Sequence, residues 1–291
     1  MSNESIEDND KLITLSFKEG VLNELAGDSE NIEASNLANL QQLSLNNVSN
    51  KSLDNLSFTP NLTSLHLNCH DDIDLGPISQ LKFLQSLSIT GANIETLASL
   101  LRIRGLTELN LNHCDVANFT DLYDLVNLNN LRLRDCDMDD LSVLRSLINL
   151  EYLNLNGNNI DDVKPVSDLR YLKSLDLDGN EITDIEPLSS LREISWIHIA
   201  ENTISDLGPL TPLKKLQSLN VSKNQITNID PLSRIPSLQW ISLAFNDIRD
   251  ISPLNSLSKL RYLDVEGDSF NQQSTRTHLP NLASKGIEIF Q

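Results

Sequence analysis

The feature that most constrains this chain is a pair of aliphatic columns in which every step is 22 residues long. The first column comprises Leu43, Leu65, Leu87, Leu109, Leu131, Leu153, Leu175, Ile197, Leu219, Ile241 and Leu263. The second column, two residues later, comprises Leu45, Leu67, Ile89, Leu111, Leu133, Leu155, Leu177, Ile199, Val221, Leu243 and Val265. A repeat this short buries its apolar side only by stacking on its neighbours, so the columns predict a solenoid.

Within each repeat, the two aliphatic positions enclose one residue, and that residue is polar in every copy. An alternation of apolar and polar residues is typical of a short strand with one buried face. Eleven such strands in register would form a parallel sheet, and the rest of each repeat would return the chain along the opposite side. The expected fold class is therefore an α/β solenoid. It would carry about eleven parallel strands on a concave face and short 3₁₀, extended or helical segments on a convex face.

The most regular repeat, residues 150–169, carries the pattern L-x-x-L-x-L-x-x-N and a tail with aspartate and proline. Closely similar tails occur at residues 182–188 and 248–254. Residues 38–268 therefore resemble the internalin-type leucine-rich repeats of bacteria. The resemblance implies a curved leucine-rich-repeat horseshoe, and internalin-type proteins bind host-cell surface proteins. The chain also resembles, more loosely, eukaryotic leucine-rich regulators of protein phosphatase 1.

The pattern divides the chain into three stretches of a single expected domain. Residues 1–37 are expected to form an acidic N-terminal tail and an irregular cap, and residues 38–268 hold about eleven repeats. Residues 269–291 are expected to form a C-terminal cap, with a short helix over 278–283 and a last strand over 286–290. Such caps cover the open ends of a solenoid and keep it soluble.

The N-terminal half departs from the regular repeat in two ways. Leu12, Leu15 and Phe17 have strand-like spacing but precede the first regular strand. The return segments at residues 96–103 and 119–125 lack proline, and their apolar spacing favours helices. A helix is wider than an extended return segment, so we expect the curvature to differ between the two halves.

An asparagine column follows the strands of the C-terminal half and comprises Asn158, Asn180, Asn202, Asn224 and Asn246. A buried amide at this position can bond the backbone of adjacent turns, so the column is predicted to be a structural ladder. Towards the N-terminus the same column continues as Cys136, Cys114, Ala92 and His70. Cysteine serves this position as an alternative to asparagine, so Cys114 and Cys136 are predicted to be structural. A disulfide between them is the alternative, and it would need oxidising conditions.

Aspartates precede the return segments at Asp140, Asp162, Asp184, Asp206 and Asp250. We predict that they cap free backbone N–H groups. The alternative is a calcium-binding ladder, which a spacing of 22 residues does not favour, because it does not gather enough oxygens around one ion. His66, Cys69 and His70 look like a metal cluster, but the register places them on the strand, in the loop and in the ladder column. No metal or cofactor is therefore expected.

The residue before the first aliphatic should face outward on the strand side. Four of the six Trp and Tyr residues of the chain occupy this row, at Tyr152, Trp196, Trp240 and Tyr262. Large aromatic anchors dominate binding hot spots, so the row predicts a binding surface with Phe245 at its rim. The alternative is that the rings pack on each other and stiffen the sheet, although serines between them should interrupt direct stacking.

Charged residues occupy the neighbouring outward positions. They are Arg132, Arg134, Asp176, Asp178, His198, Glu201 and Asp264, with Glu266 and Lys223 beside them. A charged face is usually no more than a solvated one. Next to clustered aromatic residues, however, it is typical of the polar rim of an interface.

The charge balance disfavours several partners. A formal charge of −19 and a pI near 4.5 repel phosphate backbones and anionic lipid, so neither nucleic acid nor a membrane is expected. A basic protein is favoured because opposite potentials speed encounter. The start of the chain shows no signal region, and three cysteines cannot all pair. We therefore expect a cytoplasmic protein, or one delivered to a host cell by signal-peptide-independent secretion.

The sequence contains no phosphate-binding glycine motif and no nucleophile motif. We therefore expect a non-enzymatic protein that is monomeric alone and binds a protein partner on its concave face, as a scaffold, effector or regulator. Three alternatives stay open. One is an acidic immunity protein that neutralises a basic toxin or enzyme, another is a phosphatase-regulator-like protein, and the third is a structural building block of an oligomer.

Overall fold

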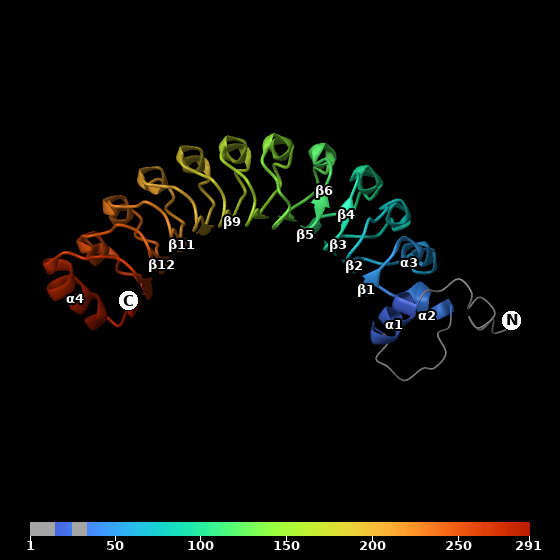
Figure 1. Ribbon diagram of the computed structural model, residues 1–291, viewed down its shortest axis with the longest axis horizontal. Coiled ribbons are helices and arrows are strands. Elements are labelled where there is room, and N and C mark those ends of the chain that lie inside the picture. Colours follow the sequence, from blue (N-terminus) through green and yellow to red (C-terminus); the bar gives the residue numbers. More distant parts are fainter. Residues whose placement is uncertain (1–14, 25–33) are drawn as a thin grey trace. The chain divides into compact units, whose positions relative to one another are not determined.

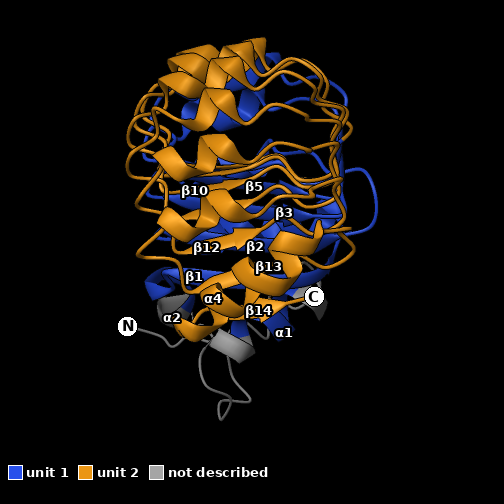
Figure 2. Cartoon of the chain, turned by 90° about the vertical axis from the view of Figure 1, so that its left-hand side faces the viewer, with its two compact units in different colours: residues 1–136 blue, residues 137–291 orange. Residues whose placement is uncertain are grey.

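The computed structural model describes residues 15–24 and 34–291, which form successive coils of 22 residues (Figure 1). These coils separate into two compact units, residues 1–136 and residues 137–291, shown in different colours in Figure 2. Within each unit the strands lie on one side, called the strand face below, and short helices lie on the other. Within the described ranges, no helix is long and apolar enough to cross a membrane.

Unit 1 is built on one run of parallel strands. In order they are β1 (Gln42–Val48), β2 (Ser64–Cys69), β3 (Ser86–Thr90), β5 (Glu108–Asn112) and β7 (Asn130–Arg132). Leu43 pairs with Leu65, and this register continues through Leu87, Leu109 and Leu131. Both aliphatic columns are buried, as the period predicts. A second pair of short strands, β4 (Asn93–Ile94) and β6 (Asp115–Val116), joins neighbouring loops on one flank.

The helices of unit 1 cap its first strand and form its return segments. They are α1 (Leu15–Glu24), α2 (Ala34–Asn39), α3 (Asn50–Asp54) and the 3₁₀ helices η2 (Asn55–Phe58), η3 (Pro77–Gln80), η4 (Ala98–Arg102) and η5 (Thr120–Asp124). Helix α1 corrects the strand-like interpretation of Leu15 and Phe17, while Leu12 lies outside the described residues. It packs so closely on β1 that a Cβ at Gly20 would lie 2.5 Å from the Ser44 carbonyl oxygen. Phe17 is buried by this packing.

Unit 2 is built in the same way. Its parallel strands are β8 (Tyr152–Asn154), β9 (Ser174–Asp176), β10 (Trp196–His198), β11 (Ser218–Asn220), β12 (Trp240–Ser242), β13 (Tyr262–Asp264) and β14 (Glu288–Phe290). Its return segments are η6 (Ser142–Ser146), η7 (Lys164–Asp168), η8 (Glu186–Ser190), η9 (Gly208–Leu210), η10 (Asp230–Arg234) and η11 (Ser252–Ser256). The eleven strands expected from the aliphatic columns are all present, five in unit 1 and six in unit 2.

The C-terminal end of unit 2 adds three further elements. The π-helical turn η12 (Ser274–His278) leads into α4 (Leu279–Ser284), and β14 then pairs in parallel with β13. The expected short helix and last strand are therefore confirmed.

The return segments η4 and η5 are 3₁₀ helices like those of unit 2, which corrects the expectation of wider helices at residues 96–103 and 119–125. In η4 the Leu100 N–H donates to the Leu97 carbonyl over 2.9 Å, as the Val166 N–H donates to the Val163 carbonyl in η7. The residue at this position is fully buried in both segments, so the repeat length and the core contact fix the 3₁₀ turn whether or not proline is present. The basis for expecting different curvature is therefore lost.

The corner after most strands has a left-handed backbone. The positions with positive φ include Gly91, His113, Asp135, Gly157, Gly179, Glu201, Lys223, Phe245 and Gly267. The equivalent position in the repeat of β2 is Cys69, which instead remains in the strand and is fully buried. His70 is consequently exposed, so its expected place in the ladder column and the expected loop position of Cys69 were both wrong. The strand continues one residue further there, which moves the buried position from residue 70 to residue 69.

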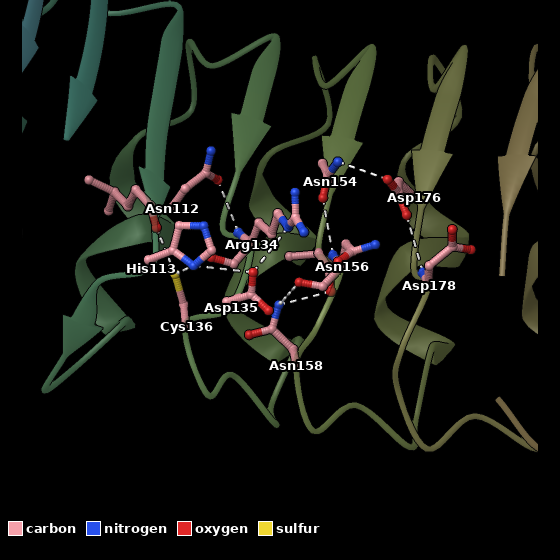
Figure 3. Close-up of polar contacts among 12 residues, drawn as sticks. Asn112, His113, Arg134, Asp135, Cys136, Asn154, Asn156, Asn158, Asp176 and Asp178 are labelled. Atoms are coloured by element: carbon pink, nitrogen blue, oxygen red, sulfur yellow. Dashed lines mark hydrogen bonds and ion pairs between the residues drawn. The ribbon is translucent and has the colours of Figure 1, made fainter. Parts of the chain in front are cut away.

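The asparagines of unit 2 connect each repeat to the one before it. The Oδ1 atom of Asn180 accepts the Ile160 N–H over 3.0 Å, and its Nδ2 atom donates to the carbonyls of Leu155 and Leu177 over 3.1 Å and 3.0 Å. Asn202, Asn224 and Asn246 repeat this arrangement, and Asn158 Oδ1 accepts the Met138 N–H (Asn158 is labelled in Figure 3). At the next step the column holds Asp268, whose Oδ1 accepts the Ile248 N–H over 3.0 Å.

Cys69, Cys114 and Cys136 form no disulfide bond, and all three are buried. The Sγ atom of Cys136 donates to the Leu111 carbonyl over 2.6 Å, and that of Cys114 donates to the Ile89 carbonyl over 3.5 Å. Burial raises the pKa of the Cys69 thiol to about 12, with a smaller contribution from Cys114. A thiol held in its neutral form is a poor nucleophile and metal ligand, so burial suits these residues to packing.

The aspartates before the return segments bond as expected. Asp140, Asp162, Asp184, Asp206 and Asp250 each accept the backbone N–H two residues later, over 2.7 to 2.9 Å. The caps lower the pKa of Asp140, chiefly through the Ser142 N–H, and that of Asp250, chiefly through the Ser252 N–H. The capping prediction is confirmed.

Candidate binding surface

The strand face of unit 2 carries an aromatic row, which consists of Tyr152, Trp196, Trp240 and Tyr262. These side chains begin strands β8, β10, β12 and β13. The exposed fraction is 46% for Tyr152 and 53% for Trp196, whereas Trp240 and Tyr262 are half-buried. An exposed ring does not contribute the free energy that its burial would give. Exposed apolar groups that lie together on one face are therefore typical of an interaction site.

The C-terminal part of the row is a continuous set of ring contacts. Trp240 and Tyr262 stack with their ring centroids 5.1 Å apart and their planes 11° apart. The centroid of the His198 ring lies 6.4 Å from that of Trp196 and 6.0 Å from that of Trp240. It therefore bridges the two tryptophans above Ser218, which lies on the strand between them. Ser218 therefore separates the two tryptophans as expected, whereas Trp240 and Tyr262 stack directly, which the expectation of a serine-interrupted row had missed. Trp240 and Tyr262 lie on adjacent strands, and a ring from the neighbouring row fills the gap over Ser218.

Phe290 of β14 extends the row, and the sequence analysis missed it. Its ring centroid lies 4.9 Å from that of Tyr262. Strand β14 pairs Ile289 with Leu263, a separation of 26 residues rather than 22. The repeat period could not reveal this residue. The predicted last strand over 286–290 was the signal that could have placed it beside Tyr262.

Carboxylates border the row over β9 and β10. The Asp178 carboxylate accepts the Ala200 N–H over 2.6 Å, and burial followed by the nearby Asp176 raises its pKa to about 6. Asp176 accepts the Asn154 amide over 2.9 Å and the Asp178 N–H over 3.1 Å (Figure 3). Glu201 pairs with the Lys223 ammonium group over 2.5 Å. The border therefore holds a desolvated carboxylate, Asp178, with a second one beside it.

A second group of carboxylates lies near the C-terminal end of the row. Asp264 accepts the Ser242 hydroxyl over 2.9 Å and the Glu266 N–H over 3.2 Å. Partial burial, followed by Asp264 and Glu288, raises the pKa of the Tyr262 hydroxyl. This end of the strand face therefore combines stacked rings with negative charge.

Phe245 lies at the left-handed corner after β12. Its φ angle is 56° and 48% of the residue is exposed. A Cβ at Gly267, the same corner one repeat later, would lie 2.5 Å from the Phe245 ring. The glycine therefore leaves room for the ring at the end of the strand.

Arg132 and Arg134 belong to unit 1, unlike the other predicted binding residues. Arg132 is exposed, and Arg134 Nε lies 3.0 Å from Asp135, which also lies 3.3 Å from His113 Nδ1 (Figure 3). All of these side chains are substantially exposed, so the group is held weakly.

Unit 1 contains a groove on one flank, lined by Asn50, Asp72, Asp74, Asn93 and Asp115 among others. Its polar groups bond one another, because Asn93 donates to Asp72 over 2.9 Å and Asn50 accepts the Asp74 N–H over 2.8 Å. Among the residues that the structure describes, no three His, Cys, Asp or Glu side chains gather where they could hold a metal ion.

A family model described as a leucine-rich repeat region matches residues 83–283. A comparison with curated proteins found no significant match.

Solved structures resemble the chain over most of its length. The internalin InlF of Listeria monocytogenes is 24% identical, with a TM-score of 0.77 over 97% of this chain and 96% of that one. The functional domain of InlJ from the same organism, described as including a cysteine ladder, is 21% identical, with a TM-score of 0.64 over 87% of this chain and 59% of that one. TLR13 in its complex with ssRNA13 is 23% identical, with a TM-score of 0.67 over 83% of this chain and 38% of that one. These likenesses confirm the solenoid fold.

Proposed function

The chain belongs to the leucine-rich-repeat family, and from that premise we propose that it is a non-enzymatic protein that holds a protein partner on the strand face of unit 2. The observation that carries the proposal is the exposed aromatic row, which extends over several strands of one face. Trp and Tyr are enriched among the residues that supply most of the binding energy at protein interfaces. Serines between them are typical of binding surfaces that tolerate varied partners.

The polar groups around the row support an interface rather than a simple core extension. Four carboxylates lie beside the rings, and each is bonded within its own chain. Asp176, Asp178 and Asp264 accept hydrogen bonds, and Glu201 forms an ion pair. Polar side chains held in this way form the rim that surrounds the apolar centre of an interface. The row and its border therefore have the composition of a binding surface.

We favour a basic partner. The formal charge of the chain is −19, which attracts a positively charged protein and repels a phosphate backbone. TLR13 has the same fold and is described in complex with ssRNA13, so the fold itself allows either class of ligand. Charge is the property that favours protein here. A scaffold, an effector, a regulator and an acidic immunity protein would all use the surface in this way.

The proposal is tested by affinity capture with the purified chain on a support. A bacterial lysate and a human cell lysate are passed over the wild type and the Trp196→Ala/Trp240→Ala variant, and retained proteins are identified and then purified. We expect a specific partner to bind the wild type and to lose at least about 30-fold in affinity to the variant, because truncating even one anchor that the partner buries costs about 2 kcal/mol.

A matched control removes two aromatic residues elsewhere. Phe83 and Tyr171 are each 61% exposed and lie outside the row, so the Phe83→Ala/Tyr171→Ala variant should bind the partner as the wild type does. If every purified partner binds the Trp196→Ala/Trp240→Ala variant with unchanged affinity, the strand face of unit 2 is not the binding surface.

A further inference from the structure

The aromatic row contains two gaps, and the structure fills only one of them. Each gap lies over a serine flanked by strands that carry a large ring: Ser174 between Tyr152 and Trp196, and Ser218 between Trp196 and Trp240. Over Ser218 the gap is occupied by the His198 ring, which contacts both tryptophans, and the serine beneath is buried. Over Ser174, by contrast, the two flanking residues are the most exposed of the row.

The residue that could fill the gap over Ser174 is engaged elsewhere. His198 reaches the gap over Ser218 from the last position of β10, and the equivalent residue of β8 is Asn154. Asn154 is short, and its amide donates to Asp176 over 2.9 Å. Within the described residues, ring contacts run from Trp196 to Phe290, and none reaches Tyr152. Among the described residues, no ring therefore covers the side of Trp196 that faces β9.

The gap over Ser174 is also the acidic one. Asp176 follows Ser174 on the same strand, and Asp178 lies just beyond it. The Asp178 carboxylate accepts the Ala200 N–H over 2.6 Å and the Asn220 amide over 3.5 Å. Burial, followed by the neighbouring Asp176, raises the pKa of Asp178 to about 6, so this carboxylate is partly desolvated. Asp178 has His198 and Glu201 as its other charged or titratable neighbours, and Glu201 is already paired with Lys223.

We propose that this open gap, bounded by Tyr152, Ser174, Trp196, Asp176 and Asp178, receives a cationic side chain of the protein partner, arginine in preference to lysine. The inference rests on the proposed function and specifies the chemistry that the surface recognises. A cation over an aromatic face is attracted by the ring, and the flanking strands are roughly 10 Å apart, which leaves room for one planar group between the rings. A guanidinium group can stack on rings and bond a carboxylate with two parallel N–H groups, which an ammonium group cannot do.

The test uses a fluorescein-labelled peptide of four Ser-Arg repeats, and the same peptide with citrulline in place of arginine. Binding to the purified full chain is measured by fluorescence anisotropy at 150 mM salt. We expect the citrulline peptide to bind at least about tenfold more weakly, because citrulline keeps the shape of arginine and loses its charge.

The decisive variant fills the gap. Ser174→Phe fills the open gap with a ring, as the His198 ring fills the gap over Ser218. It should therefore weaken binding of the arginine peptide by at least about tenfold while the chain stays folded. Ser86 occupies the same row position on β3 of unit 1, and Ser86→Phe is the matched control that should leave binding unchanged. Thermal unfolding of both variants verifies that they are folded.

A second pair of variants separates the gap from the general acidity of the chain. Asp176→Asn/Asp178→Asn and Asp161→Asn/Glu181→Gln change the net charge equally, but only the first pair borders the gap. We expect the first pair alone to weaken binding. Equal weakening by both pairs, or full binding by Ser174→Phe, overturns the proposal.

The outcomes also separate this inference from the proposed function. In one outcome a partner binds the Trp196→Ala/Trp240→Ala variant weakly and the Ser174→Phe variant normally, and the peptide binds all variants alike. This outcome supports the function and overturns the inference. In the other outcome the arginine peptide binds at the gap, but purified protein partners bind the Trp196→Ala/Trp240→Ala variant as tightly as the wild type. This outcome supports the inference and overturns the function.

Discussion

The two units solve the same problem differently on the flank where the loops of successive repeats meet. In unit 1 the Asp115 and Ala117 N–H groups donate to the carbonyls of Ala92 and Ile94, so the loops pair directly as β4 and β6. In unit 2 the Glu181 N–H also donates to the Ile160 carbonyl, but the Ile160 N–H donates to the side chain of Asn180, so one backbone bond and one amide join neighbouring loops.

The difference explains which residue the ladder position needs. Where the loop backbones pair with each other, a small apolar or thiol side chain such as Cys114 is sufficient behind them. Where a loop N–H bonds the ladder side chain instead, as that of Ile160 does, the position must supply an acceptor and two donors, and asparagine is the side chain that does so in this volume. The sequence of the ladder column therefore reports how the adjacent loops are bonded.

The largest expected effect is the loss of one amide from unit 2. Asn180→Ala removes the acceptor of the Ile160 N–H and the donor to the Leu155 and Leu177 carbonyls, all in buried surroundings. Unsatisfied buried polar groups cost about 1–3 kcal/mol each, so we expect the free energy of unfolding to fall by about 3 kcal/mol. Urea unfolding measures it. Asn159 is exposed, and Asn159→Ala should change stability by less than about 0.5 kcal/mol.

The reciprocal exchange comes next. Cys114→Asn brings an amide into unit 1, where the loop N–H groups of Asp115 and Ala117 are already bonded to backbone carbonyls. We expect a loss of about 2 kcal/mol, from overpacking and from polar atoms without partners, whereas Cys114→Ala should cost about 1 kcal/mol. Hydrogen exchange at β4 and β6 reports the local effect. If Cys114→Asn proves as stable as the wild type, the two flanks are interchangeable and the comparison fails.

The end of the ladder gives a pH-dependent prediction. Asp268 occupies the ladder column with a carboxylate whose Oδ2 atom is buried without a hydrogen-bond partner, and burial raises its pKa to about 6. Because the pKa of Asp268 is raised in the folded state, the protonated carboxyl group contributes to stability below about pH 4. This contribution is lost as the pH rises through about 6. Asn246 donates its Nδ2 to the carbonyls three and 25 residues earlier, and an amide at residue 268 would find Val265 and Leu243 there.

Asp268→Asn should therefore stabilise the chain by about 1 kcal/mol at pH 7, a figure reduced for solvent screening because the residue is not fully buried. The gain should shrink as the pH falls from 7 to 4, since the protonated wild-type acid can donate as the amide does. Thermal unfolding of both proteins across this range measures the difference. A gain that is independent of pH would show that the ionised Oδ2 atom is not the cause.

The smallest expected effect tests the equivalence of the return segments. Ser99 of η4 corresponds to Pro165 of η7, and the same column already holds Pro77 in η3 of unit 1. Because the 3₁₀ geometry is shared, Ser99→Pro should raise stability by about 0.4–1 kcal/mol by restricting the unfolded chain. A loss of stability in the same unfolding measurement would show that η4 differs from the proline-containing segments.

The sequence predicted the strands and their register, because burial against a neighbour every 22 residues leaves a periodic record in Leu43, Leu65 and their successors. It failed where a structural choice depends on a single corner. Nothing in the period distinguishes Cys69, which stays in the strand, from Gly91, which turns the chain. The form of the return segments was likewise hidden, since core contact rather than helical propensity decides it.

For the candidate site, the sequence identified the aromatic row but not its internal organisation. The positions of Trp196 and Trp240 follow from the register alone. The filling of the gaps depends on side-chain conformation, which the register does not fix. The His198 ring fills one gap, whereas Asn154 bonds Asp176 and leaves the other open. Phe290 was missed because it lies beyond the last regular step, although the predicted last strand over 286–290 contains it.

The asparagine bonds of unit 2 all point in one direction along the chain, and this has a consequence for synthesis. Asn180 satisfies the Ile160 N–H of the preceding repeat, and Asn202 satisfies that of Ile182. A repeat that leaves the ribosome is therefore incomplete until the next repeat follows it. Folding of unit 2 during translation should advance from the N-terminus with a lag of one 22-residue step, and a chain released early exposes one unfinished coil.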